Sequence, residues 1–161
     1  METKELLDYL DRHSIEYECL EHPPVYTSEE ARRLIPERPG ASAKNLFLRN
    51  KKGNQHYLFV CNDLKTSDLK DLAAQVGESR LSLASPERLK KYLGLEPGAV
   101  SLLALVNDRE NHVQLLVDED LWEKEKLQCH PLTNTATLII PLPDIKRFLK
   151  VTSHEVRLVK V

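Results

Sequence analysis

Hydrophobic residues recur with helical spacing in some segments of the chain and with strand spacing in others. Near the start, Leu6, Leu7 and Leu10 are spaced so that they share one face of a helix. This pattern predicts a helix that Thr3 caps and that ends near His13.

The most regular alternation predicts a β-hairpin over residues 44–61. Leu46 and Leu48 alternate with Phe47 and Arg49, a turn follows at 51–54, and a second apolar run continues to Val60. Glycine within the turn agrees with this assignment.

Turn residues and capping signals divide the rest of the chain into short elements. Further helices are predicted at 27–35, 68–76, 85–93, 121–122 and 144–150, and further strands at 15–19, 100–106, 113–117, 135–140 and 155–159. Hairpins outnumber strand–helix–strand units, so about seven strands and about five short helices predict an α+β fold with a mixed, largely antiparallel sheet. No linker or repeat interrupts the pattern, and we expect one domain over 1–161.

Composition adds little beyond the class of an ordinary globular protein. Charged residues make up 30% and hydrophobic residues 41% of the 161 residues. No apolar run is long enough for a membrane span, and the first residues lack the apolar stretch of a signal peptide. The three cysteines, Cys19, Cys61 and Cys129, are expected to be buried free thiols in a reducing compartment. The expected location is the cytoplasm.

Charge is distributed unevenly, although the net charge is only −2. Residues 30–70 contain nine Lys and Arg against four Asp and Glu, a local excess of +5. A basic face on an acidic body suits a partner that touches the protein locally, such as one end of an RNA. A solvated rim of the hairpin accounts for the same charges.

Several chemistries are excluded by spacing. The six histidines show no HxH or HExxH pattern and there is no CxxC pair, so no metal or other cofactor is expected. Cys129 and His130 are adjacent, but neighbours in an extended segment point to opposite faces and do not form a nucleophilic pair. Motifs of serine hydrolases, P-loop NTPases and dinucleotide enzymes do not occur.

Four polar clusters have no evident structural task. Lys44 and Asn45 stand at the entrance of the hairpin, where a cation and an amide can hold an anion and a polar ligand. Gly98 precedes an apolar run and allows close approach of a ligand to the backbone, or forms a simple type II turn. His130 can act as an acid–base group, a hydrogen-bond anchor or a loop residue. His22, before two prolines, is more typical of a structural role.

Five segments, taken in order, resemble the YbaK/prolyl-tRNA synthetase editing-domain family, and most closely its freestanding ProX-type members. The resemblance extends over essentially the whole chain. The matching segments are His22-Pro-Pro-Val-Tyr-Thr-Ser-Glu-Glu-Ala31, Lys44-Asn-Leu-Phe-Leu-Arg-Asn-Lys-Lys-Gly53, Lys65-Thr-Ser-Asp-Leu-Lys-Asp-Leu72, Gly98-Ala-Val-Ser-Leu-Leu-Ala-Leu-Val-Asn-Asp108 and His130-Pro-Leu-Thr-Asn-Thr-Ala136.

The resemblance implies a site and an activity. The family's hairpin lysine, on which activity depends most, falls on Lys44, the glycine of its GxxxP loop on Gly98, and the histidine of its late loop on His130. Leu102 stands where the family pattern has proline, which bears on the shape of this loop. The amino-acid side of the site is expected to include Tyr26, Thr27, Asn45, Ser101 and Asn134.

The implied reaction is hydrolysis of the aminoacyl ester at the 3′ end of a mischarged tRNA, with Ala-tRNA(Pro) as the expected substrate and serine or cysteine as alternatives. Prolyl-tRNA synthetase is a second candidate partner. The expected contacts to the acceptor stem are Arg32, Arg33, Lys51 and Lys52. Two alternatives lack chemistry: a regulatory module that binds an amino acid, and a plain RNA-end binder.

Overall fold

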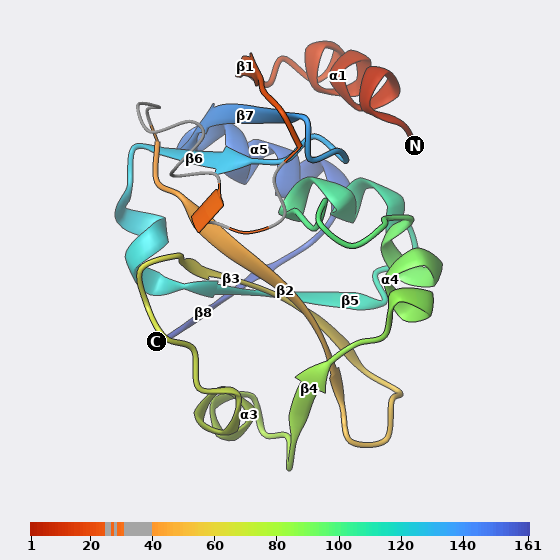
Figure 1. Cartoon of the computed structure of the whole chain (residues 1–161), viewed down its shortest axis with the longest axis vertical. Helices are drawn as coiled ribbons and strands as arrows, with labels where there is room; N and C mark the ends of the chain where they lie inside the picture. The colour runs from red at the N-terminus through yellow and green to blue at the C-terminus, as the bar shows by residue number, and fades with distance from the viewer. Residues whose placement is uncertain (25–26, 28, 31–39) are drawn as a thin grey trace.

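Eight strands form two sheets in the computed structural model, which describes residues 1–24, 27, 29–30 and 40–161 (Figure 1). The three-stranded sheet has the order β1 (Glu18–Glu21), β7 (Ala136–Pro141), β6 (Lys126–Cys129), and the five-stranded sheet has the order β4 (Leu81–Leu83), β2 (Ala43–Asn50), β3 (His56–Asn62), β5 (Val113–Asp118), β8 (Val156–Val159). Among the pairs of described strands, β3–β5 and β5–β8 are parallel and the others are antiparallel. The predicted α+β class and the largely antiparallel pairing are confirmed, but the strands divide between two sheets.

The helices begin and end where the capping signals indicate. They are α1 (Thr3–Arg12), α3 (Leu69–Val76), α4 (Pro86–Leu93) and α5 (Leu142–Thr152), with the 3₁₀ helices η1 (Leu102–Asn107) and η2 (Glu119–Glu123). Asp68 accepts hydrogen bonds from the first turn of α3, and Ser85 caps α4. Gly94 ends α4 in the left-handed conformation, with φ of 67°. Most of the helix predicted at 27–35 lies outside the described residues.

One predicted element is wrong in type, one begins with a different cap, and two short strands have no counterpart in the prediction. The strand predicted at 100–106 is the 3₁₀ helix η1, because a short apolar run that is buried on all sides has no period to distinguish strand from helix. Strands β4 and β6 were not predicted, since three or four residues carry too little alternation. Thr3 does not cap α1: Glu2 precedes the helix, and the Thr3 hydroxyl donates to the Pro131 carbonyl at 2.7 Å.

The five-stranded sheet separates two apolar cores. The larger core fills the space between the two sheets and includes Phe47 of β2 and Leu138 of β7. The smaller core lies on the other face of the five-stranded sheet, where Leu48 packs with Leu72 of α3. Alternation along β2 therefore directs odd-numbered side chains to the larger core and even-numbered ones toward α3.

The cysteines are only partly as predicted. Cys61 and Cys129 are buried free thiols, whereas Cys19 is exposed on β1. Burial raises the pKa of Cys61 to about 11 and that of Cys129 to about 12. Neither of these two thiols is a thiolate at neutral pH, so both lack the nucleophile that cysteine catalysis requires.

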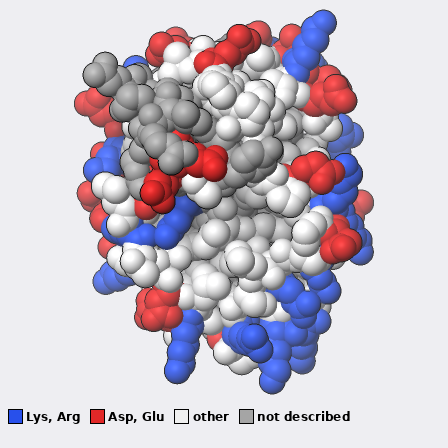
Figure 2. All heavy atoms as spheres, in the orientation of Figure 1, with Lys and Arg blue, Asp and Glu red and all other residues white. Residues whose placement is uncertain are grey.

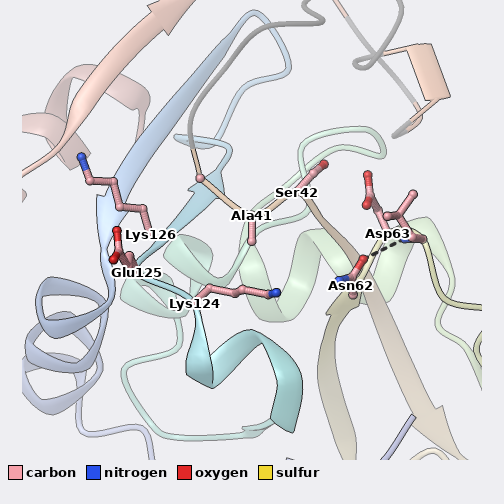
Figure 3. Close-up of a pocket in the computed structure, with 9 residues that line it drawn as sticks. Ala41, Ser42, Asn62, Asp63, Lys124, Glu125 and Lys126 are labelled. Carbon is pink, nitrogen blue, oxygen red and sulfur yellow. Dashed lines mark hydrogen bonds between the residues drawn. The ribbon is translucent and has the colours of Figure 1, made fainter.

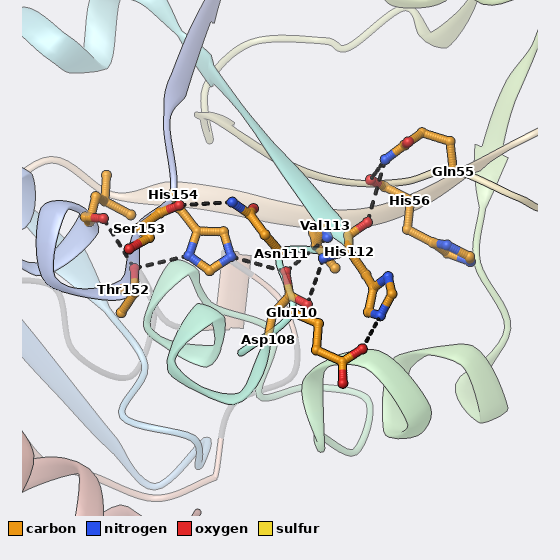
Figure 4. Close-up of polar contacts among 11 residues, drawn as sticks. Gln55, His56, Asp108, Glu110, Asn111, His112, Val113, Thr152, Ser153 and His154 are labelled. Atoms are coloured by element: carbon orange, nitrogen blue, oxygen red, sulfur yellow. Dashed lines mark hydrogen bonds and ion pairs between the residues drawn. The ribbon is translucent and has the colours of Figure 1, made fainter.

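A buried polar pair fixes the end of η1 (Figure 4). His154 Nε2 lies 2.9 Å from Asp108 Oδ2, and Asp108 also accepts hydrogen bonds from the backbone of His112 and Val113. Burial alone would raise the pKa of Asp108, but the hydrogen bonds from His154 and the two backbone N–H groups outweigh it and lower that pKa. The pair joins the segment after η1 to the end of α5.

A second buried histidine lies under the hairpin. His56 is 2% exposed, its ring is stacked on Phe47 with centroids 5.5 Å apart, and Arg88 Nη1 donates to its Nε2 at 3.0 Å. Burial, with further contributions from the cations Arg88 and Arg49, lowers the pKa of His56 to about 4. The imidazole is therefore neutral at physiological pH.

This histidine makes stability depend on pH. Its folded pKa of about 4 lies below the ordinary value of about 6.5, so its contribution is complete above pH ~6.5 and is lost as the pH falls toward 4. We expect a loss of about 3 kcal/mol at most across this window, measured by urea unfolding. His56→Gln keeps an acceptor for Arg88 and should flatten this part of the profile; an unchanged profile in that variant would contradict the assignment.

Candidate functional site

Lys44 and Asn45 leave β2 on opposite faces. Ala43 and Phe47 pack against the larger core, so Asn45 lies on that face, whereas Lys44 shares the other face with Leu46. The Lys44 ammonium donates to the Lys65 carbonyl at 2.7 Å. The adjacent pair predicted from the sequence is thus divided between the two faces of the sheet.

The start of β2 has one edge that no described strand pairs. β4 pairs with β2 only over Leu48–Asn50, while β3 pairs with the whole of β2 on its other side. Among the described residues, this edge of β2 therefore has no strand partner over Ala43–Phe47. The Lys44 side chain reaches the loop after β3, on the other side of β2 from this edge.

The loop that holds Lys44 is anchored by a buried carboxylate. Asp118, at the end of β5, is fully buried and accepts from Lys65 Nζ at 3.0 Å and from the Asn62 backbone at 3.1 Å. Asp120 accepts from the same ammonium at 2.6 Å. Hydrogen bonding and charge from Asp120 and then Asp118 raise the pKa of Lys65, which stays charged. The Lys65 carbonyl that receives Lys44 is held in place by these contacts.

Gly98 occupies a turn that only glycine adopts readily. Its φ is 95°, and the Ala99 N–H donates to the Glu96 carbonyl at 3.3 Å across Pro97. This is the turn predicted as one of the two interpretations of the segment. Three residues further on, Ser101 is fully buried and its hydroxyl accepts from the Leu103 backbone at 3.2 Å. Ser101 therefore caps η1 and shapes the loop.

The fold brings His22 and His130 together from distant parts of the chain. Their ring centroids lie 6.5 Å apart. His22 Nδ1 donates to the Pro23 carbonyl at 2.8 Å, so its Nε2 accepts from the Thr137 hydroxyl, also at 2.8 Å. His130 Nδ1 donates to the Ala136 carbonyl at 3.2 Å. Both histidines are anchored to β7, and no pattern in the sequence points to Thr137.

Of the other predicted site residues, the structure describes Thr27, Asn134, Lys51 and Lys52. Thr27 accepts from the Glu30 backbone at 3.1 Å, which agrees with the predicted capping contact. Asn134 is half-buried in the loop before β7, and Lys51 and Lys52 are exposed in the hairpin turn. The predicted residues that lie outside the described part of the chain are Tyr26, Arg32 and Arg33.

A pocket of about 710 Å³ opens where β2 begins and β3 ends (Figure 3). Three segments line it: 40–42, 62–64 and 124–126. The Ala41 N–H donates to the Lys126 carbonyl at 2.9 Å, which joins the two sheets beside the pocket. In Figure 3 the Lys124 side chain extends toward Asn62. Sequence analysis missed this pocket because each segment is unremarkable alone.

The described residues offer groups that bind and orient a polar substrate. Among them there is no group of three or more His, Cys, Asp or Glu able to hold a metal ion. None of the described helices has the length and apolar character needed to cross a membrane. Taken singly, the Lys44 ammonium can hold an anionic group, and the Gly98 turn allows close approach of a ligand to the backbone.

The anchoring carboxylate generates a stability prediction. Asp118→Ala removes the acceptor of a half-buried ammonium and of the Asn62 N–H, and we expect it to cost about 2–3 kcal/mol in urea unfolding. Asp120→Ala is the matched control, since this exposed carboxylate contacts the same ammonium and its loss should change stability little. Equal effects of the two variants would show that burial of Asp118 is not what matters.

Comparison with known proteins gives consistent results for sequence and fold. The aminoacyl-tRNA editing domain model matches residues 22–148. The prolyl-tRNA editing protein ProX of Acetoanaerobium sticklandii is 38% identical over 152 residues, covering 94% of this chain and 93% of that protein. The prolyl-tRNA synthetase associated domain-containing protein 1 of Danio rerio is 37% identical over 153 residues, covering 94% and 83%.

The fold agrees with a solved structure of low sequence similarity. A crystal structure described as that of a candidate trans-editing enzyme for prolyl tRNA synthetase superposes with a TM-score of 0.72 at 22% identity, covering 99% of this chain and 96% of that one. The family model spans most of the chain and the matched relatives span nearly its full length. The protein therefore belongs to the aminoacyl-tRNA editing domain family.

Proposed function

We propose that the protein is a trans-editing deacylase that hydrolyses the aminoacyl ester of mischarged tRNA, with Ala-tRNA(Pro) as its substrate. The observation that carries this proposal is the 38% identity to ProX, which extends over more than nine-tenths of both chains. An editing domain acts on aminoacyl-tRNA, and the prolyl tRNA and the alanyl group are the finer parts of the proposal. A location in the cytoplasm and an association with prolyl-tRNA synthetase belong to it as well.

Lys44 supplies the positive charge of the proposed site. Its ammonium rests on the Lys65 carbonyl, a neutral acceptor that an RNA phosphate or ribose oxygen can replace. The anchored loop after β3 fixes the position of the ammonium, where the 3′-terminal nucleotide would bind. Asn45, on the other face, contacts the amino-acid side.

Hydrolysis needs little more than positioning, because an aminoacyl ester is already reactive. Backbone N–H groups near Gly98 face the ester carbonyl and stabilise the charge that develops on its oxygen. Backbone groups and the substrate's own ribose hydroxyl orient the attacking water. His130 acts as an anchor that shapes the pocket, because its Nδ1 is engaged with Ala136. Tyr26, Thr27 and Asn134 complete the proposed amino-acid side, whereas the fully buried Ser101 contributes only by shaping the loop.

Leu102 does not favour a non-catalytic module. It is the first residue of η1, a position where the backbone N–H has no partner within the helix, so leucine and the family's proline are interchangeable there. Ser101 is extended, with φ of −158° and ψ of 151°, which is a conformation that also suits a residue before proline. A proline at this position would therefore fit the same backbone conformation.

The proposed activity is tested by release of amino acid from Ala-tRNA(Pro), Pro-tRNA(Pro), Ser-tRNA and Cys-tRNA. We expect rapid loss of Ala-tRNA(Pro) alone, and a decrease of about 100-fold or more in Lys44→Ala. Stability of that variant should fall by only about 1 kcal/mol, because the Lys65 carbonyl loses one donor. Lys70→Ala, an exposed lysine of α3, is the control and should retain full activity. Near-normal deacylation by Lys44→Ala would contradict the role of this lysine.

Exchange of the first η1 residue tests the interpretation of the loop. Leu102→Pro should cost about 1–2 kcal/mol, from the lost apolar contacts of a buried side chain, and leave the preference among charged tRNAs unchanged. Leu103→Pro is the matched control: it removes the N–H that Ser101 accepts, so it should be more destabilising and reduce activity. A change of amino-acid preference in Leu102→Pro would show that the loop shape does depend on this residue.

A further inference from the structure

Six basic residues from three segments converge at the end of the molecule distant from the three-stranded sheet. This group, called the basic tip below, consists of Arg49, Lys51, Lys52, Arg80, Arg88 and Lys91. Figure 2 shows Lys and Arg side chains gathered at the lower right, over the β2–β3 turn that Figure 1 shows in the same place. Arg80, Arg88 and Lys91 lie outside the basic stretch of the sequence, so only the fold adds them.

Strand register and helix packing bring the segments together. β2 and β4 pair Asn50 with Leu81, so the next positions outward place Lys51 opposite Arg80. Arg88, on α4, donates to the Gly53 carbonyl in the hairpin turn at 2.9 Å. Gly53 is so close to both arginines that an added Cβ would lie 2.8 Å from the Arg88 guanidinium and 3.0 Å from that of Arg49.

Arg49 and Arg88 are held by uncharged acceptors, which leave their positive charges without a neutralising carboxylate. Arg49 donates to the carbonyls of Asn50 and Lys51, and Arg88 to Gly53 and the neutral ring of His56. Within the described part of the chain, no member of the basic tip forms an ion pair with a carboxylate. The segment 49–56 contains no acidic residue at all.

The basic tip faces the same way as part of the proposed site. Arg49 and Asn45 are both odd-numbered residues of β2, and α4 packs on the larger core through Leu89 and Leu93. From Asn45 to Lys51 the strand rises about 20 Å, at about 3.3 Å per residue. At about 3.4 Å per nucleotide of a stacked strand, this span corresponds to about six nucleotides, which is past the unpaired 3′ end of a tRNA.

We propose that the basic tip binds the phosphate backbone of the acceptor-stem duplex of the RNA whose 3′ end enters the proposed site. This inference rests on the proposed function and adds to it the surface that receives the stem. Arginines fixed on neutral carbonyls keep donors for phosphate oxygens, and exposed lysines supply mobile charge. Among the described residues of these elements, Leu83 alone is a large exposed hydrophobic side chain, so the surface suits a polyanion better than a membrane.

The test compares two triple variants. Lys51→Gln, Lys52→Gln and Arg80→Gln together remove three exposed charges of the basic tip, and Lys4→Gln, Lys150→Gln and Lys160→Gln remove three exposed charges elsewhere. For full-length mischarged tRNA, the basic-tip variant should raise KM about tenfold or more at 0.1 M salt with kcat nearly unchanged, and the dependence of log KM on log salt should flatten by roughly 0.7–0.9 per lost contact. The control variant should behave as the wild type.

A truncated substrate separates stem binding from chemistry. Both variants and the wild type should cleave an aminoacylated oligonucleotide that carries only the unpaired 3′ end at equal rates. Equal KM of the two variants for full-length tRNA would overturn the proposal, and so would a loss of cleavage of the truncated ester in the basic-tip variant.

Direct binding keeps the inference testable if the proposed activity fails. An uncharged acceptor-stem minihelix should bind the wild type and the control variant, and bind the basic-tip variant about tenfold more weakly. No binding to the wild type would overturn the proposal, as would equal binding by all three proteins. Binding of the tip to anionic lipid vesicles or an acidic peptide in preference to the minihelix would also overturn it.

Discussion

The pairing of β2 with β3 is the interaction on which the rest of the structure depends. Its register runs from Ala43–Asn62 to Arg49–His56 and decides which side chains of β2 face each core. A shift of one residue would exchange the two faces, placing Lys44 in the larger core and Phe47 against α3. The same pairing sets the tight hairpin turn, and hence the place where Arg49 and Arg88 meet. Site and basic tip are therefore two ends of one pair of strands.

Buried carboxylates hold the adjoining loops in position relative to these strands. Asp118 fixes the loop after β3, whose Lys65 carbonyl receives Lys44, and Asp108 fixes the segment after η1 through His154. Each carboxylate satisfies backbone N–H groups and a cationic or imidazole partner at once, which makes its burial tolerable. Long-range contacts of this kind keep a site rigid although its residues lie on loops and strand ends.

The chemistry that the described residues favour is electrostatic. Cys61 and Cys129 are poor nucleophiles at neutral pH because their burial raises their pKa values, and His22 and His130 are occupied with structural hydrogen bonds. The remaining candidates are the Lys44 ammonium, which a ligand could draw away from the Lys65 carbonyl, the edge of β2 that no described strand pairs, and the Gly98 turn. These groups suit an ester that is already activated, for which orientation and stabilisation of developing charge supply most of the rate.

Local sequence determined the elements whose signals are local. Asp68, Ser85 and Gly94 cap helices whatever surrounds them, and the alternation from Leu46 to Arg49 is enough to predict a strand. The resemblance of ordered segments indicated Lys44, Gly98 and His130 before any contact was known. The apolar run after Gly98 could not be assigned, because a segment buried on every side carries no period.

Tertiary structure decided everything that requires distant residues to meet. It separated the strands into two sheets, divided Lys44 from Asn45, and joined Lys65 to Asp118, although those two are 53 positions apart in the sequence. It also added Arg80 and Arg88 to the hairpin turn. The physical reason is that side-chain pattern specifies which face of an element is buried, whereas the element that covers this face is chosen by packing and register across the whole chain.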